Sequence, residues 1–168
     1  MSTTTPRLPA DVHAFAQLLS STRRGARLAR LLAAEQLRTW PVSAGVTERA
    51  EQIVAELAAN AALHGRVGNR DFRLALTLDT TAGLLRIAVT DARGECRPSP
   101  PTEGPTSLDA SGRGLLLVDA LADRWGVEPY PPGGKTVWAE CDFMATVCPG
   151  VARRAAATRT SGKERSVE

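Results

Sequence analysis

The sequence contains few of the residues that build disulfide frameworks and zinc sites. Of 168 residues, three are cysteine and two are histidine. Cys96, Cys141 and Cys148 are odd in number and show no Cys-x-x-Cys spacing, and His13 and His64 are the only histidines. We therefore expect neither a disulfide framework nor a zinc site. A reducing cytoplasm is the simplest compartment for such a chain.

Aromatic residues and long apolar runs are also scarce. Phe, Trp and Tyr make up 4% of the residues, and the net charge is +3. Residues 149–168 hold five basic and two acidic side chains and so account for that charge, which leaves the rest of the chain neutral. Because nucleic-acid binding needs clustered Lys and Arg on a folded face, we expect no direct nucleic-acid partner. No run of about 18 apolar residues and no signal peptide occurs, which predicts no membrane partner and no export.

The chain has the size and composition of a single domain. Hydrophobic residues make up 43% of it, which is enough for a sizeable core. Residues 1–10 are small, polar and interrupted by proline, and residues 149–168 lack any apolar period. We expect a flexible N-terminus at 1–10, a folded domain at 11–148 and a disordered basic tail at 149–168.

Apolar periodicity divides the folded part into strands and helices. Alternating apolar residues predict a hairpin at 72–78 and 85–89. The proline-rich residues 94–112 predict an irregular lid. The other predicted elements are a strand at 15–20, a helix from Ser21 or Thr22 to about Arg38, a helix capped by Thr47 and stopped at Gly65, a helix at 115–121, and strands at 125–130 and 136–144.

Three polar side chains recur every four residues in the second predicted helix. Glu56, Asn60 and His64 stand in an otherwise apolar, alanine-rich run, and on a helix they share one face. Burying unpaired polar groups costs about 1–3 kcal/mol each, so the pattern predicts a ligand site, with a nucleotide as the best interpretation. The plainer alternatives are a surface pair of Glu56 and Asn60 and a His64 that meets only solvent or the helix dipole.

Two further segments suit a nucleotide. Asp91 ends the second strand of the hairpin, where its carboxylate can accept a hydrogen bond from an exocyclic amine such as adenine N6. Gly112, Arg113 and Gly114 lead into an apolar helix, so the glycines allow close backbone approach and the helix N-terminus offers N–H groups to phosphate. Strand termination and a tight loop are the alternatives for these residues, and Arg113 can equally face solvent or a partner.

Side-chain chemistry suggests a role for three of the candidates. Asn60 offers a neutral oxygen to Mg²⁺, whose other ligands would be phosphate oxygens and water. Glu56, one turn earlier, can accept a proton from an attacking hydroxyl or water. Thr136, on the last predicted strand, can place its hydroxyl near Asp91 and support adenine recognition.

Taken in order, these motifs resemble those of the GHKL ATP-binding superfamily, which includes histidine kinases, gyrase-type topoisomerases and heat-shock ATPase chaperones. Residues 56–64 resemble its N box, 91–94 its first glycine box, 111–118 its second glycine box and 134–138 its terminal strand motif. The resemblance spans roughly residues 11–144. It is closest to small bacterial anti-sigma-factor serine/threonine kinases.

The resemblance implies an α+β fold, a two-layer sandwich of the GHKL (Bergerat) type with helices on one face of a mixed, mostly antiparallel sheet. It implies ATP and Mg²⁺ as cofactors, with Glu56 as the catalytic base and Asn60 as the metal ligand. The nucleotide would be bound by Asn60, His64, Asp91, Gly94, Gly112, Arg113, Gly114 and Thr136. The implied partners are a small Ser/Thr-containing anti-sigma-factor antagonist, a sigma factor, or both, and homodimer formation stays open.

One segment departs from the family pattern. The family often has Asp-x-Gly-x-Gly where this chain has Asp91-Ala92-Arg93-Gly94-Glu95. Two functions therefore stay open: a kinase that phosphorylates the antagonist, and a non-catalytic module of the same fold that sequesters a partner with weak or no ATP binding. An ATPase or sensor without protein-kinase activity is a third.

Overall fold

Five strands form one sheet in the order β1-β2-β3-β5-β4, and every described pair of neighbours is antiparallel. The computed structural model describes residues 11–64, 67–68, 70–94 and 110–143, with the backbone alone at 110–113. The strands are β1 (Val12–Leu19), β2 (Phe72–Asp79), β3 (Leu84–Asp91), β4 (Arg124–Tyr130) and β5 (Gly134–Asp142). The helices are α1 (Arg23–Thr39), α2 (Ala44–Leu63) and α3 (Ala110–Leu121).

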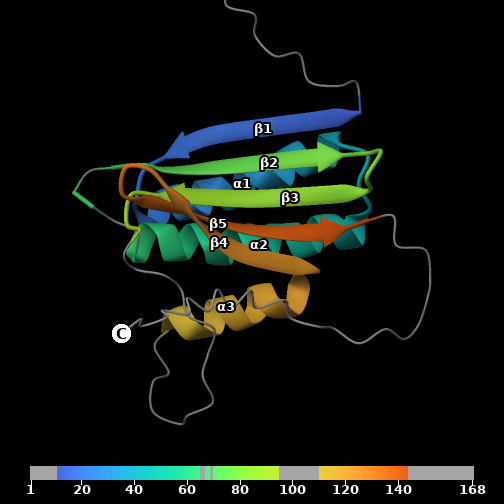
Figure 1. Cartoon of the computed structure of the whole chain (residues 1–168). Helices are drawn as coiled ribbons and strands as arrows, with labels where there is room; N and C mark the ends of the chain where they lie inside the picture. The colour runs from blue at the N-terminus through green and yellow to red at the C-terminus, as the bar shows by residue number, and fades with distance from the viewer. Residues whose placement is uncertain (1–10, 65–66, 69, 95–109, 144–168) are drawn as a thin grey trace, which may run out of the picture.

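The helices lie on one side of this sheet. Figure 1 shows α1 and α2 behind the strands and α3 below them, where it packs against α2 and beside β4. On β3, Leu85, Ile87 and Val89 are buried, whereas the residues between them are partly exposed. Since successive strand side chains point to opposite faces, the sheet has an apolar face under the helices and a polar open face.

Local chemistry explains where the first two helices start and how closely they pack. Thr22 caps α1, since its Oγ1 accepts a hydrogen bond from the Gly25 N–H at 3.0 Å, and Ser43 caps α2 in the same way. Helices α1 and α2 then pack side by side over the sheet. Their fully buried alanines have small side chains, so the two backbones can approach closely: Ala29, Ala33, Ala50 and Ala58.

The fold class and the order of elements predicted from the sequence are confirmed. Two helix starts were wrong. Helix α2 begins at Ala44 because Ser43 rather than Thr47 is its cap, and α3 begins at Ala110 rather than at 115. Of the predicted lid, residues 95–109 lie outside the described residues, as do 1–10 and 149–168. None of the described helices is long and apolar enough to cross a bilayer.

Candidate functional site

The polar face of α2 holds the first group of predicted site residues. Glu56 and Asn60 lie one turn apart and are half-buried, and neither side chain forms a hydrogen bond to another described residue. His64 is the exposed C-cap, and its backbone N–H donates to the Asn60 carbonyl at 2.8 Å. The structure therefore leaves a half-buried carboxylate and amide available to a ligand, with His64 at the exposed end of the helix.

Gly114 brings α3 against this pair. A Cβ atom built on Gly114 would lie 2.5 Å from Glu56 Oε2 and 3.8 Å from Asn60 Nδ2. A side chain at position 114 would therefore displace the Glu56 carboxylate, which is why glycine fits this close approach. The segments that the sequence singled out as N box and second glycine box thus touch in the folded chain.

The glycines sit differently in α3 from the sequence prediction. Gly112 and Gly114 lie inside the helix rather than before it, because α3 begins at Ala110. The first four N–H groups of a helix, counted from the cap, have no intrahelical acceptor, and that of Gly112 is among them here. The Arg113 side chain lies outside the described residues.

Asp91 ends β3 as predicted, but its carboxylate already has two donors. It is 6% exposed, and its Oδ1 accepts hydrogen bonds from the Arg93 backbone N–H and from Lys135 Nζ, both at 2.9 Å. Lys135 Nζ also donates to the Arg93 carbonyl at 2.7 Å. Lys135 is itself only 5% exposed, so the two charges form a buried ion pair.

Thr136 is not the neighbour of Asp91 that the sequence predicted. It pairs with Thr90 across β3 and β5, and the two hydroxyls lie 2.8 Å apart. Because Asp91 follows Thr90, its side chain points to the opposite face, where Lys135 is its partner in the register. The placement of Thr136 was therefore wrong. Sequence reasoning also missed Lys135, although residues 135, 137, 139 and 141 share one face.

Gly94 holds the segment after Asp91 against the turn between β4 and β5. Its N–H donates to the Gly133 carbonyl at 2.8 Å. A Cβ atom on Gly94 would lie 2.6 Å from the Gly134 carbonyl oxygen and 2.9 Å from that of Gly133. In the described residues Gly94 thus contacts this turn and not the Glu56–Asn60–Gly114 group.

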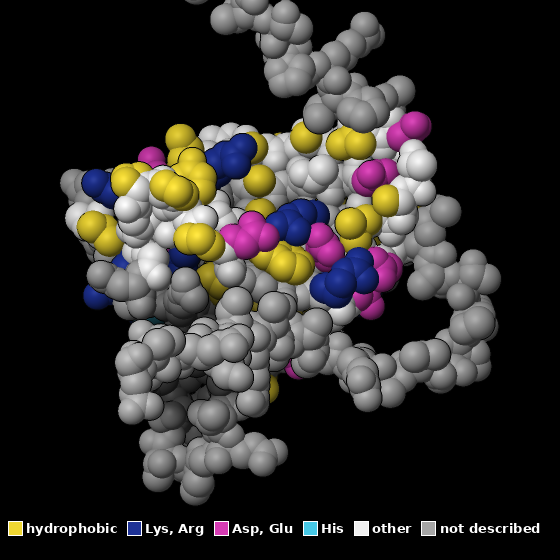
Figure 2. Space-filling model, in the orientation of Figure 1, with side chains coloured by type: hydrophobic (Ala, Val, Ile, Leu, Met, Phe, Trp, Pro, Cys, Tyr) yellow, Lys and Arg dark blue, Asp and Glu magenta, His cyan; other side chains and the backbone are white. Residues whose placement is uncertain are grey.

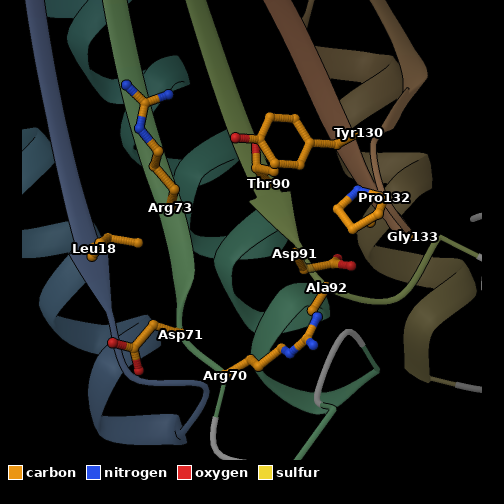
Figure 3. A pocket seen from close by; sticks show the side chains of 11 residues that line it. Leu18, Arg70, Asp71, Arg73, Thr90, Asp91, Ala92, Tyr130, Pro132 and Gly133 are labelled. Carbon is orange, nitrogen blue, oxygen red and sulfur yellow. The ribbon is translucent and has the colours of Figure 1, made fainter.

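A cavity of about 190 Å³ opens at the same end of the sheet. Leu18, Arg73 and Thr90 line it together with Tyr130 and Pro132, and in the view of Figure 3 the Tyr130 ring overlaps Thr90. The first three occupy one cross-strand row of the open face. Asp91 lines this cavity but Glu56, Asn60 and Gly114 do not, so the cavity meets the predicted nucleotide site only at Asp91.

Comparison with known proteins identifies the family of this chain. Residues 19–141 match the model of the histidine kinase-like ATPase domain. The chain belongs to that family. Over 48 residues it is 50% identical to the uncharacterized protein SCO4941 of Streptomyces coelicolor, which covers 28% of this chain and 44% of that protein.

A solved structure shows the fold of this family member. The RsbU and RsbW domains of Rv1364c from Mycobacterium tuberculosis match with a TM-score of 0.58 and 19% identity, over 76% of this chain and 32% of that one. The chain therefore spans less than half the length of either protein. The resemblance to the GHKL superfamily is confirmed by the family model, and the structure that contains an RsbW domain shows the same fold.

Membership of a histidine kinase-like ATPase family implies nucleotide binding in general, and the two halves of the site fit a nucleotide unequally. At the Glu56–Asn60–Gly114 group, a half-buried carboxylate and amide lie against α3 without a hydrogen bond to another described residue, so both are available to a ligand. At Asp91, Oδ1 already accepts from Lys135 Nζ and the Arg93 N–H, so a base amine that binds this oxygen competes with a buried ammonium. The described residues contain no cluster of three or more His, Cys, Asp or Glu, so a metal ion there would depend on phosphate oxygens and water as well.

Proposed function

We propose that this protein is an ATP-binding regulator of the anti-sigma-factor serine/threonine kinase type. It transfers the terminal phosphoryl group of ATP to a Ser or Thr of a small antagonist protein and binds a sigma factor. The observation that carries the proposal is the contact of Gly114 with Glu56 and Asn60, because it joins two helices around groups suited to a phosphate and a metal ion.

Each residue of this group has a definite task in the proposal. Glu56 accepts the proton of the attacking hydroxyl, for which its carboxylate is half-buried and has no hydrogen bond to another described residue. The Asn60 side-chain oxygen would hold Mg²⁺, which would neutralise phosphate charge. Gly114 lets the Glu56 carboxylate lie against α3, and the first N–H groups of α3 can face the phosphates.

A second function is favoured by the other half of the site. The buried ammonium of Lys135 already binds one oxygen, Oδ1, of the carboxylate that would recognise the base. A non-catalytic module that sequesters its partner with weak or no ATP binding would carry the same fold. The two functions differ in whether nucleotide binds at all, and that is directly measurable.

Calorimetric titration with ATP, with and without Mg²⁺, tests the first function. We expect Mg²⁺-dependent binding that Asn60→Ala abolishes. Gln52→Ala is the matched control, because it removes an exposed amide two turns earlier in the same helix and should leave binding unchanged. An unaltered affinity in Asn60→Ala would rule out the metal role of this residue.

The role of Glu56 needs a separate readout. Glu56→Gln keeps the size of the side chain but cannot accept a proton, so we expect ATP binding to persist while release of ADP falls by roughly 100-fold or more, as for loss of a general base. Gly114→Ala should lower turnover as well, because its Cβ displaces the Glu56 carboxylate. Undiminished turnover in Glu56→Gln would exclude Glu56 as the base.

A further inference from the structure

Lys135 meets Asp91 at the point where base recognition would take place. Its Nζ donates to Asp91 Oδ1 at 2.9 Å, and the two side chains are 7% and 5% exposed. An exocyclic amine on a purine is a donor of the same kind, and it would approach the same carboxylate at the same distance. We propose that the Lys135 ammonium is an internal competitor for the adenine amine, and that it sets the affinity of this protein for nucleotide. The proposal rests on the proposed function, since it concerns the same site.

The position of Lys135 is fixed by its surroundings. It stands directly opposite Asp91 in the register of β3 and β5. Its Nζ has a second acceptor, the Arg93 carbonyl, at 2.7 Å. The Gly94 N–H in turn bonds the Gly133 carbonyl, which joins the segment after Asp91 to the residues just before Lys135. The ammonium is thus held by two acceptors that belong to one anchored segment.

Displacing this ammonium is costly. A base amine that takes the place of Nζ on Asp91 Oδ1 must break the 2.9 Å hydrogen bond between them and shift a charged group within a site that water barely reaches. Buried charges that lose their partner are strongly unfavourable unless they find new acceptors. The chain therefore binds adenine nucleotide more weakly with Lys135 present than with a small neutral residue at this position.

Titration of the full chain with Mg-ATP compares wild type with Lys135→Thr. We expect affinity for ATP to rise at least tenfold in Lys135→Thr. Arg86→Met is the matched control, because it also removes a cation paired with a carboxylate, but on the open face of β3, and it should leave affinity unchanged. Circular dichroism confirms that each variant is folded.

A second ligand locates the effect. Mg-tripolyphosphate has no base, so its affinity should be the same in wild type and in Lys135→Thr. An equal rise for tripolyphosphate would overturn the proposal, because Lys135 would then act on the phosphates. A fall in ATP affinity would overturn it too, since Lys135 would then help to hold the base.

A second variant covers the case in which Lys135→Thr does not fold. Lys135→Gln keeps a neutral donor for the buried carboxylate, and we expect a smaller rise in ATP affinity with it. Equal binding by wild type and all Lys135 variants would overturn this inference and leave the nucleotide site standing. Absence of binding in wild type and every Lys135 variant at millimolar ATP would overturn both the inference and the proposed function.

Discussion

The two faces of the β3–β5 strand pair carry ion pairs in opposite environments. On the helix-covered face, Lys135 and Asp91 form one pair whose side chains are 7% and 5% exposed. On the open face, Arg86 and Arg124 share Glu140, and Arg124 also pairs with Asp142, 51% and 38% exposed respectively. Figure 2 shows basic and acidic side chains alternating across this open face.

The difference teaches which charges the fold depends on. Exposed pairs gain little because water solvates each charge almost as well as its partner does. The carboxylates of Asp142 and Glu140 raise the pKa of the Arg124 guanidinium, so this group stays charged. Because the guanidinium is exposed, its ion pairs add little to the free energy of unfolding. A buried pair has no water to replace a lost partner, so its two members depend on each other.

Breaking the buried pair should have the largest effect. Lys135→Met leaves the Asp91 carboxylate buried without its cation, and we expect it to lower the free energy of unfolding by about 3–5 kcal/mol. Urea unfolding followed by circular dichroism measures this. The double variant Lys135→Met with Asp91→Leu should recover most of the loss, and a loss below about 1 kcal/mol in the single variant would show that water reaches Asp91.

The second largest loss of stability is expected at Gly94, whose N–H anchors the segment after Asp91 to the Gly133 carbonyl. Gly94→Ala places a Cβ against two backbone carbonyl oxygens that cannot rotate away, so we expect a loss of about 1–3 kcal/mol in the same assay. Gly114→Ala is the matched control, since its Cβ would meet the flexible ends of the Glu56 and Asn60 side chains rather than backbone, and alanine favours a helix. Equal losses in the two variants would contradict the anchor role of Gly94.

Removing cations from the open face should matter little. We expect Arg124→Met and Arg86→Met each to cost less than about 1 kcal/mol, and less still in high salt. Arg86 should cost more than Arg124, because its guanidinium also stacks on Trp138 at 4.4 Å from the ring centre. A loss as large as that of Lys135→Met would remove the contrast between the two faces.

The last prediction involves no substitution and so no change in the free energy of unfolding. The labelling rate of Cys141 reports how well the helix-covered face of the sheet is buried. Burial raises the pKa of the Cys141 thiol from 9.0 to about 11. Two pKa units mean about 100-fold less thiolate near neutral pH, so iodoacetamide should label Cys141 far more slowly in the native chain than in urea. Peptide mass spectrometry separates it from the other cysteines, and equal rates would mean that this face is open to solvent.

Part of the site could be predicted from the sequence because it rests on local periodicity. Glu56 and Asn60 share a helix face wherever a helix forms, and Asp91 ends its strand whatever that strand pairs with. Thr136 was misplaced because the choice of face along β5 depends on its register with β3. A shift by one residue moves a side chain to the other face of a sheet.

The sequence by itself determined the elements, their order and the family, since apolar period and motif order are properties of short segments of chain. Only the tertiary structure decided that Gly114 lies against Glu56 and that Lys135 is paired with Asp91. The first contact depends on how α3 packs on α2, and the second on the pairing of β3 with β5. Both contacts join residues more than 40 positions apart in the chain, and sequence periodicity describes only residues that are a few positions apart.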